Sequence, residues 1–564
     1  MSLEDIFYDP DVVSLVMERE SVTESYLENN PNILFRKELT GGYSVIYVRE
    51  NNVDKVVSEI ATHAIVPYPL VLGLMGTQEL TDSGITQVQQ QPFLNLMGSG
   101  VLLGFIDTGI DYTSSAFRYE DGGSKILYIW DHTIRGGPPD GYPFGTEYST
   151  AQIDQALRSP DPHEIVPHRD TVGHGTFLAS IAGGRGPGEY TGAAPDAEII
   201  AVKLKRARPS DYARFLIPPE QENAFSSADF MLGVQYIIDK ALALRRPVAI
   251  CIAMGTNSGG HDGYLPFGSY LSRISTIIGV AVCSAAGNEG QAKHHTHGRL
   301  AGDGDTKNIE LRVGSSHGDV HMSIWNFAAD RMSVSIRSPT GATISRIPAR
   351  SGIVYTDKLV LERTTVRIEY IYPIERSGSQ VTRIQILSAT PGIWTITLHG
   401  DSILDGTYHA WLPITGFIDP ETVFLSPSPN YTIVTPGNTL GVISCGAYDS
   451  HTDSFAAFSS QGPSRFSSIL PVLVAPGVEV SGIFPGGPGV MSGTSVSSAI
   501  TTGACALMLQ WGIVEKNDIS LDSYRIRVNL IAGCTRDPTR EYPNNQWGYG
   551  RLNLYNTFRS LRSY

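Results

Sequence analysis

Residues 101–109, VLLGFIDTG, form an apolar run that ends in an aspartate and a glycine. Two similar short runs follow, IIAVKL at 199–204 and VAICIAM at 248–254, with a helical pattern at 228–244 between them. Strands that are apolar on both faces and alternate with helices are typical of a parallel sheet covered by helices. We therefore predict an α/β fold built on a doubly wound, mostly parallel sheet.

The alternation of strands and helices stops near residue 300. From 307 to about 429, short period-two runs are separated by turn signals with no helical pattern between them, which predicts an antiparallel sandwich or jelly roll. These runs are 308–313, 320–325, 332–337, 365–372, 381–387, 393–398 and 408–412. We expect an inserted β domain at 300–430, which divides the α/β unit into residues 79–299 and 431–564.

Residues 1–78 are expected to form a separate small α+β unit. The segment 41–50 is rich in aromatic and β-branched residues and predicts a strand, and Asn52 is a candidate cap for a helix at 53–61. A second apolar extended run, PLVLGLM at 69–75, is followed by a polar, turn-like stretch at 76–84. This stretch is a plausible domain boundary.

Charge and cysteine content narrow the class of protein. The net charge of −14 argues against a nucleic-acid partner. The start of the chain is acidic and lacks the pattern of a secretory signal, and no run approaches the ~20 apolar residues that a membrane span needs. The cysteines are odd in number and lie mostly in apolar runs, so we expect free, buried thiols in a reducing compartment. They are Cys251, Cys283, Cys445, Cys505 and Cys534.

Three segments carry the residue types of nucleophilic catalysis. Ser495, within SGTSVSSA at 492–499, follows a glycine turn at the start of an apolar helix pattern. A serine hydroxyl needs a base, which His174 in GHGT would supply, while Asp107 at the end of the first apolar run would orient the imidazole. Each segment alone also fits a helix cap or a surface residue. Together they predict a catalytic triad in the chain order Asp, His, Ser.

A fourth segment, VCSAAGNEG at 282–290, places Asn288 after a small-residue turn at the end of a predicted strand. A side-chain amide there can donate to a developing oxyanion, with the Ser495 backbone N–H as the second donor. The alternative is an asparagine that merely forms the turn.

Six motifs together resemble the subtilases, the subtilisin-like serine proteases. They are DTGID at 107–111, GHGT at 173–176, AGNEG at 286–290, FSSQGP at 458–463, APG at 475–477 and GTS at 493–495. The resemblance implies a serine endopeptidase that works through an acyl-enzyme and assigns Asn288 to the oxyanion hole. It also implies that residues 1–78 are a propeptide, acting as chaperone and inhibitor, which is removed by self-cleavage near 77–80.

Within the subtilases, the chain resembles the Csp proteases of clostridial spores. The features are the absence of a secretory signal, the β insert between Asn288 and Ser495, and the HHTH stretch at 294–297. This resemblance implies synthesis in the cytoplasm, association with the spore, and activation of another spore or cell-wall protein by limited proteolysis. Some members of the group have lost triad residues, so an inactive scaffold or receptor in germination signalling is the alternative.

Two positions depart from the subtilase pattern. Ala499-Ile500 stands where the family usually has a Pro-His pair after the nucleophile, which bears on the geometry of the first helical turn. Ala253, Met254 and Gly255 stand where the family often has Ser-Leu-Gly lining the S1 pocket, so these residues are expected to bind substrate, but the side-chain preference cannot be transferred.

No cofactor is expected to be required. His294, His295 and His297 could suggest zinc, but no cysteine or carboxylate cluster completes them, which favours a solvated or structural loop. Calcium ligation by Asp111 and Asp453 cannot be assigned from spacing.

The remaining candidates are structural. The polar segment 159–171, which contains His163 and His168, is predicted to be a solvated loop. Trp325 and Trp394 are expected in the core of the insert rather than on a sugar-binding surface. The expected partners are a protein substrate and the chain's own propeptide.

Overall fold

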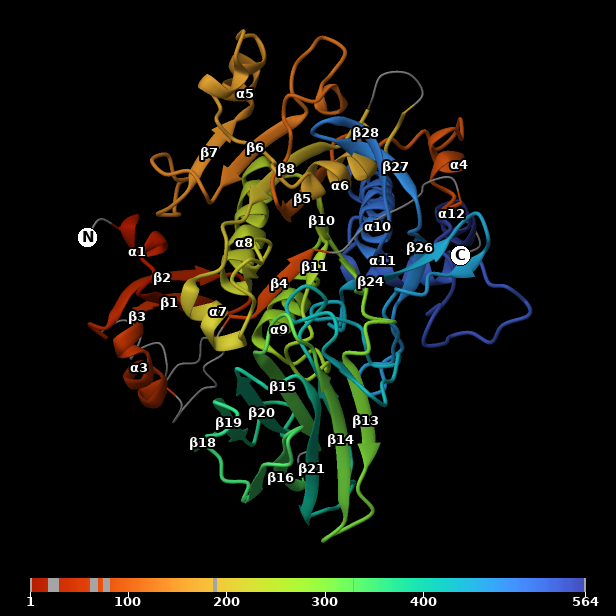
Figure 1. Cartoon of the computed structure of the whole chain (residues 1–564). Helices are drawn as coiled ribbons and strands as arrows, with labels where there is room; N and C mark the ends of the chain where they lie inside the picture. The colour runs from red at the N-terminus through yellow and green to blue at the C-terminus, as the bar shows by residue number, and fades with distance from the viewer. Residues whose placement is uncertain are drawn as a thin grey trace.

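The computed structural model describes residues 3–18, 30–60, 69–74, 82–185, 190–327 and 329–561. At its centre lies a nine-stranded sheet in the order β25-β24-β12-β10-β5-β8-β6-β7, with β26 paired to β24 (Figure 1). The pairs are parallel except β6–β7 and β24–β25. The strands are β5 (Leu102–Asp107), β6 (Ile126–Asp131), β7 (Thr146–Ser149), β8 (Glu198–Lys203), β10 (Val248–Ile252), β12 (Val280–Ala285), β24 (Ile443–Asp449), β25 (Ser454–Phe455) and β26 (Leu473–Pro476).

Strand β5 explains why the opening motif is apolar throughout. Leu103 and Phe105 belong to the core on one face of the sheet, while Leu102 and Ile106 belong to the core on the other. A strand buried on both faces has no solvated positions, so the usual alternation of apolar and polar residues disappears. The predicted doubly wound α/β architecture is confirmed.

Helices cover both faces of this sheet. The first core contains residues of α4 (Ile85–Gln89), α6 (His174–Gly183), α10 (Thr494–Leu509), α11 (Ser523–Gly533) and α12 (Leu554–Leu561). The second contains residues of α8 (Ser227–Leu244) and α9 (Pro266–Ile274). Other helical segments are α5 (Thr150–Leu157), α7 (Pro209–Phe215), the short turns Ser115–Phe117 and Pro162–Glu164, and the π-helical turn Gln510–Val514.

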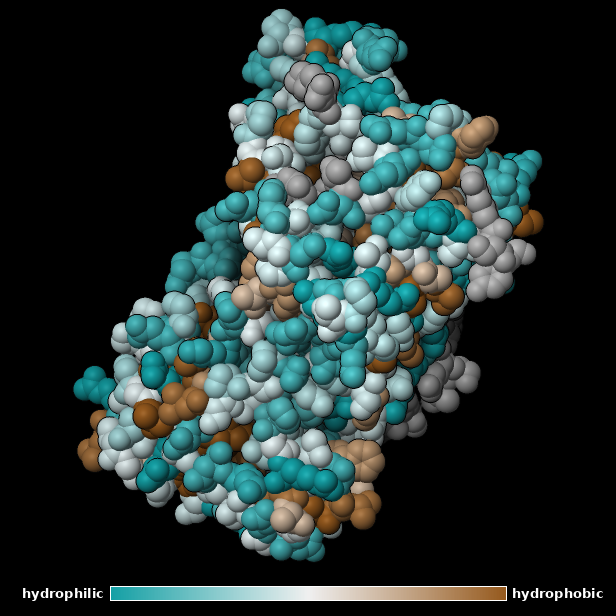
Figure 2. All heavy atoms as spheres, turned by 90° about the vertical axis from the view of Figure 1, so that its right-hand side faces the viewer, coloured by the Kyte–Doolittle hydropathy of each residue, from teal (hydrophilic) through white to brown (hydrophobic). Residues whose placement is uncertain are grey.

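Helix α10 with its following turn, Thr494–Val514, is long and apolar enough to cross a membrane by length and composition. Because 89% of its most apolar window is buried within the fold, this segment has the character of a core helix. Among the described residues, no other helix meets the same criteria. The molecular face in Figure 2 is mostly hydrophilic or neutral, with apolar side chains gathered toward its lower end.

The N-terminal unit contains an antiparallel sheet in the order β1-β3-β2. Its elements are α1 (Asp5–Tyr8), β1 (Val12–Glu18), β2 (Ile33–Leu39), β3 (Tyr43–Arg49), the turn Glu50–Asn52 and α3 (Val53–Ile60). Tyr43, Tyr47 and Phe7 join the same apolar core as α8 and α9. The predicted strand at 41–50 and helix at 53–61 are therefore present, and their sheet packs on two helices of the α/β unit.

The β insert comprises two antiparallel sheets that share an apolar core, in the orders β13-β22-β15-β20-β19-β18 and β17-β16-β21-β14-β23 (Figure 1). Trp394 is completely buried and Trp325 is 5% exposed, as expected for core residues. All seven strands predicted from the period-two runs are present among the eleven strands of these two sheets. The strands are β13 (His295–Arg299), β14 (Thr306–Val313), β15 (Val320–Asn326), β16 (Arg331–Arg337), β17 (Thr343–Ile347), β18 (Val354–Leu359), β19 (Thr364–Ile371), β20 (Gln380–Leu387), β21 (Gly392–Ser402), β22 (Thr407–Trp411) and β23 (Val423–Phe424).

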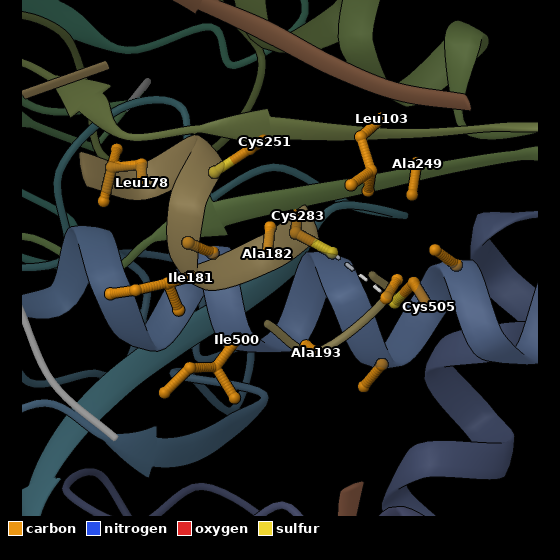
Figure 3. Close-up of a cluster of buried hydrophobic side chains, with 14 of the residues drawn as sticks. Leu103, Leu178, Ile181, Ala182, Ala193, Ala249, Cys251, Cys283, Ile500 and Cys505 are labelled. Atoms are coloured by element: carbon orange, nitrogen blue, oxygen red, sulfur yellow. Dashed lines mark hydrogen bonds between the residues drawn. The ribbon is translucent and has the colours of Figure 1, made fainter. Parts of the chain in front are cut away.

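All five cysteines are free and buried, which confirms the expectation of free, buried thiols. Cys283 on β12 and Cys505 on α10 are neighbours, with their sulfurs 3.5 Å apart (Figure 3). Burial raises the pKa of the Cys251 thiol to about 12. A protonated, buried thiol is a poor nucleophile, so Cys251 acts as a packing residue.

Candidate active site

Asp107 and His174 form a buried pair at the edge of the central sheet. Asp107 ends β5, whose neighbours β8 and β10 continue the sheet in opposite directions, so it lies at the topological switch point. His174 begins α6, and its Nδ1 lies 2.8 Å and 3.0 Å from the two carboxylate oxygens of Asp107. His174 is 6% exposed and Asp107 is 2% exposed. The carboxylate thus fixes the orientation of the ring.

The glycines beside His174 allow this approach. Gly173 caps α6 with φ of +87°, a conformation that favours glycine. A Cβ atom on Gly175 would lie 2.2 Å from the carbonyl oxygen of Gly109 and 3.1 Å from the Cβ of Asp107. Any larger residue would therefore push the helix away from Asp107.

Asp170, which the sequence did not single out, connects the segments of Asp107 and His174. Its carboxylate accepts hydrogen bonds from Thr108 Oγ1 at 2.8 Å, from Gly173 N at 2.8 Å, and from the backbone and hydroxyl of Thr176 at 2.9 and 2.7 Å. Burial alone would raise the pKa of this carboxyl, but the hydrogen bonds hold the pKa below its usual range. Asp170 therefore joins the loop after Asp107 to the first turn of α6.

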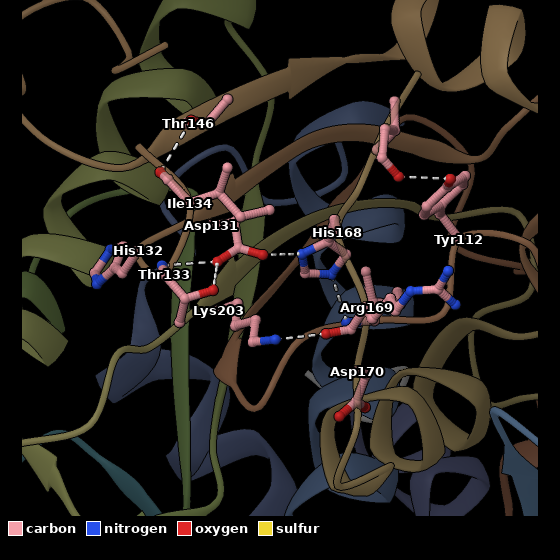
Figure 4. A network of polar contacts seen from close by, with 12 residues as sticks. Tyr112, Asp131, His132, Thr133, Ile134, Thr146, His168, Arg169, Asp170 and Lys203 are labelled. Atoms are coloured by element: carbon pink, nitrogen blue, oxygen red, sulfur yellow. Dashed lines mark hydrogen bonds and ion pairs between the residues drawn. The ribbon is translucent and has the colours of Figure 1, made fainter. Parts of the chain in front are cut away.

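The prediction of a solvated loop at 159–171 is wrong for its C-terminal half. His168 is completely buried, and its Nδ1 lies 2.6 Å from the carboxylate of Asp131 at the end of β6 (Figure 4). Its Nε2 accepts the backbone N–H of Ile110 at 3.2 Å. Polar residues with distant polar partners can be buried, and Asp131 is 37 positions away. His163 is half-buried, with its Nδ1 3.3 Å from Tyr112 Oη.

Ser495 is the second residue of α10, which packs against α6. The side chain is completely buried, and its hydroxyl donates to the carbonyl oxygen of Ala253 at 3.2 Å. The Ser495 backbone N–H lies in the first helical turn, where no intrahelical acceptor exists. The hydroxyl of Ser497 donates to the carbonyls of Ala475 and Pro476, both at 3.0 Å, and fixes this turn against β26.

Helix α10 continues without a break through Ala499 and Ile500. Both residues are completely buried in the first core, where Ile500 lies near Ile181 of α6 (Figure 3). The departure from the usual Pro-His pair is thus accommodated by ordinary helix packing.

Asn288 lies at the exit of β12, beside the start of α10. Its side-chain oxygen accepts from the backbone N–H and the hydroxyl of Thr494, both at 3.0 Å. Since an amide is planar, this fixes its Nδ2 donors in the opposite direction. The loop is also held by Ser460, whose N–H donates to Gly287 O at 2.8 Å and whose hydroxyl accepts from Glu289 N at 3.0 Å.

An extended segment of the N-terminal unit lies beside these groups. Strand β4 (Val71–Leu74) pairs antiparallel with β9 (Phe225–Ser226) on one side and β11 (Met254–Gly255) on the other. Gly73 faces Gly255, and Leu74 faces Met254. A Cβ on Gly255 would lie 2.3 Å from Val434, so this strand requires glycine at that position. The predicted cleavage region at 77–80 lies outside the described residues.

The candidate metal ligands are engaged in other contacts. Asp111 accepts from the backbone and hydroxyl of Thr113 at 3.0 and 2.6 Å, and Asp453 pairs with Arg551. His295 and His297 belong to strand β13, so the expectation of a loop there is wrong. Within the described ranges, no group of three or more His, Cys, Asp or Glu side chains could hold a metal ion.

The chain is similar to known proteins in both sequence and structure. The sequence profile of the subtilase family matches residues 98–310 and 422–550, together more than half of the chain. The structure is similar to that of the Clostridium perfringens CspB protease, with a TM-score of 0.77 and 30% identity, covering 86% of this chain and 99% of that chain.

Curated relatives match shorter segments. Serine protease AprX of Bacillus subtilis is 29% identical over 147 residues, or 22% of this chain and 31% of AprX. The subtilase-type proteinase RRT12 of Saccharomyces cerevisiae is 32% identical over 109 residues, or 18% of this chain and 21% of RRT12. These matches therefore span about a third of the relatives' length or less. The family profile and the structural similarity together establish that the chain belongs to the subtilase family of serine proteases.

Proposed function

We propose that this chain is an endopeptidase that cleaves an extended peptide through Asp107, His174 and Ser495. The observation that carries the proposal is the position of β4, which lies between β9 and β11 as a bound peptide would. The residue before β11, Ala253, contacts the Ser495 hydroxyl. A polypeptide backbone is thus held by antiparallel pairing next to a candidate nucleophile, as in β-strand recognition of substrates.

In the proposed reaction, Ser495 Oγ attacks the scissile carbonyl carbon while His174 accepts the hydroxyl proton. Asp107 holds the proton on Nδ1 and stabilises the imidazolium that forms. His174 then gives its proton to the leaving amine, which breaks the C–N bond and leaves an acyl-enzyme. A water molecule, deprotonated by the same histidine, hydrolyses the ester and regenerates the serine.

The oxyanion is proposed to bind between the Ser495 backbone N–H and the Nδ2 of Asn288. The bonds from Thr494 to the Asn288 oxygen support this role, because they orient the amide donors before substrate arrives. Donors that are already oriented need no reorganisation during the reaction, which is the main source of oxyanion stabilisation.

We also infer that residues 1–78 are a propeptide that the enzyme removes from itself. The register supports this inference, since Leu74 pairs with Met254, next to Ala253 and its contact with Ser495. The bond to be cut is therefore expected within the few residues that follow Leu74, in agreement with the range 77–80.

We further propose that the mature enzyme activates another spore or cell-wall protein by limited proteolysis during germination, after synthesis in the cytoplasm. The similarity to CspB over nearly that protein's whole length supports this role. Deleting the coding sequence in the organism that carries it should delay germination, and a Ser495→Ala copy should not restore the normal rate. Restoration by that copy would favour a scaffold or receptor.

The peptidase proposal is tested by purifying the wild-type chain and Ser495→Ala and sequencing their amino termini. The wild type should begin near residue 78, whereas the variant should keep its original terminus. Processing of Ser495→Ala at the same bond, under the same conditions, would refute self-cleavage.

A further inference from the structure

Glu289, the residue after Asn288, places a buried carboxylate at the meeting point of three segments. The residue is 4% exposed. Its carboxylate lies 2.7 Å from His294 Nδ1, accepts from Asn257 Nδ2 at 3.1 Å, and accepts from Thr415 N at 2.9 Å. Each partner belongs to a different part of the chain.

These partners link the β insert to the active site. His294 directly precedes β13, the first strand of the insert, and Thr415 follows β22 on the return path. Asn257 follows β11, the strand that pairs with β4, and its Nδ2 also donates to Leu412 O at 3.2 Å. Glu289 therefore joins the entry and exit of the insert to the peptide-binding strand and to the loop of Asn288.

An apolar cluster packs at the same junction. Ile414 and Phe417, on the return path from the insert, share this cluster with Ala224, directly before β9, and with Val434. Val434 is the residue against which Gly255 of β11 packs. The return segment of the insert thus shares an apolar cluster with residues that adjoin both strands enclosing β4.

The charge on Glu289 strengthens this arrangement. Burial alone would raise the pKa of its carboxyl, but His294 and Thr415 outweigh burial and hold the pKa below its usual range. Removing one partner from a buried carboxylate strongly destabilises the folded state. The fold therefore favours keeping all three contacts of Glu289 at the same time. Movement of the insert would therefore be transmitted to the residue beside Asn288.

We propose that Glu289 is a positioning residue through which the β insert sets the placement of Asn288 and β11 for catalysis. This inference rests on the peptidase activity proposed above. A displacement of about 1 Å at a catalytic group can cost about 100-fold in rate, so a link of this kind affects turnover more than substrate affinity.

The test compares kcat and KM for a synthetic peptide of residues 69–84, measured by mass spectrometry with the purified, processed full-length protein. The variants are Glu289→Gln, His294→Ala and His294→Asn. Asparagine can place its side-chain N–H close to the position of the histidine Nδ1, so it should preserve the bond to Glu289. A variant that stays unprocessed is compared through the first-order rate at which its own chain is cut.

Asp262→Asn is the matched control. Asp262 pairs with Arg465 at 2.7 Å, and both side chains are buried. Arg465 also donates to Ser379 of the insert at 2.7 Å, so this pair holds the insert, and among the described residues neither side chain hydrogen-bonds to the Asn288 loop. Thermal unfolding of every variant identifies effects that arise from stability alone.

We expect Glu289→Gln and His294→Ala to lower kcat by about 10- to 100-fold with KM changed less than about threefold. His294→Asn should restore kcat to within about threefold of wild type, and Asp262→Asn should retain kcat even if its melting temperature falls. Wild-type kcat in Glu289→Gln, or an equal loss in Asp262→Asn, would overturn the inference. Failure of the wild type to cleave would instead contradict the proposed function.

Discussion

The catalytic domain contains two buried histidine–aspartate pairs of nearly the same geometry. His174 lies 2.8 Å from Asp107, and His168 lies 2.6 Å from Asp131, each through Nδ1. The pairs are neighbours, because Asp170 and the loop at 108–110 contact both segments. Their chemistry is expected to differ.

The difference lies in what surrounds the rest of each ring. Nε2 of His168 accepts the N–H of Ile110 and Nδ1 lies against Asp131, so both ring nitrogens are engaged in structural hydrogen bonds. His174 instead begins a helix that packs against the helix of Ser495. In the proposed mechanism, a histidine–aspartate pair is therefore a base where a nucleophile adjoins it and a structural bond elsewhere.

The largest expected effect comes from making the same substitution in both pairs. His174→Asn should lower kcat by about 10⁴-fold or more, because asparagine retains a donor toward Asp107 but cannot act as the base. His168→Asn should keep kcat within about tenfold while lowering the free energy of unfolding by about 1–3 kcal/mol, since the buried Ile110 N–H loses its acceptor. Peptide cleavage and denaturant unfolding measure the two effects. Equal losses of kcat in two folded variants would contradict the distinction.

The second effect concerns the oxyanion site, which the His168 pair lacks. Asn288→Ala should lower kcat about 10²- to 10³-fold with little change in KM, because the amide acts on charge that develops in the transition state. Steady-state kinetics with the 69–84 peptide measures both constants. If KM rose while kcat stayed at the wild-type value, Asn288 would be binding substrate instead.

A smaller effect is expected at Asp170, the carboxylate that connects the two pairs. Asp170→Asn keeps the size but turns an N–H₂ group toward hydrogen-bond donors, so we expect a loss of about 3 kcal/mol in unfolding free energy and about tenfold in kcat. Asp161→Asn, on the same loop but exposed, is the control and should change stability by less than about 0.5 kcal/mol. Comparable destabilisation by both substitutions would show that Asp170 has no special role.

The last expected effect is on the pH dependence of stability, which separates paired from unpaired histidines. Neither ring nitrogen of the buried His132 has a hydrogen-bond partner in the described structure, and burial lowers its pKa to about 3. Between about pH 3 and 6.5 the unfolded chain binds the extra proton, so stability falls as pH falls through this window, by at most about 1.4 kcal/mol per pH unit. His132→Phe should flatten the dependence of unfolding free energy on pH from 6.5 to 4. An unchanged slope would mean that His132 does not contribute.

Local sequence patterns were sufficient to predict strands that have a continuous or an alternating apolar pattern. Strand β5 was predicted from a continuous apolar run, because the strand is buried on both faces of the sheet. Seven strands of the insert were predicted from the alternation of apolar and polar residues. Strands β17 and β18 were missed because most of their side chains are partly or fully exposed, so no apolar period marks them. Strand β13 was missed because its buried histidine, His295, packs in an aromatic neighbourhood that includes Trp411, far away in sequence.

The candidate catalytic residues were predictable because each lies in a short motif with its own glycines. The residues that support them were not, because their roles depend on partners that only folding brings together. Asp170 and His168 lie in a polar segment typical of a solvated loop, and their burial depends on Thr108 and Asp131. Glu289 was visible only as the neighbour of Asn288, since its partner Thr415 lies 126 positions away.

The most direct test of the account is to treat the purified, processed protein with a fluorophosphonate probe and map the labelled residue by mass spectrometry. We predict stoichiometric labelling at Ser495, abolished in His174→Asn and retained in His168→Asn. A processed protein whose Ser495 stays unlabelled, or that is labelled at another serine, would contradict the assignment of the nucleophile and favour a subtilase scaffold without peptidase activity.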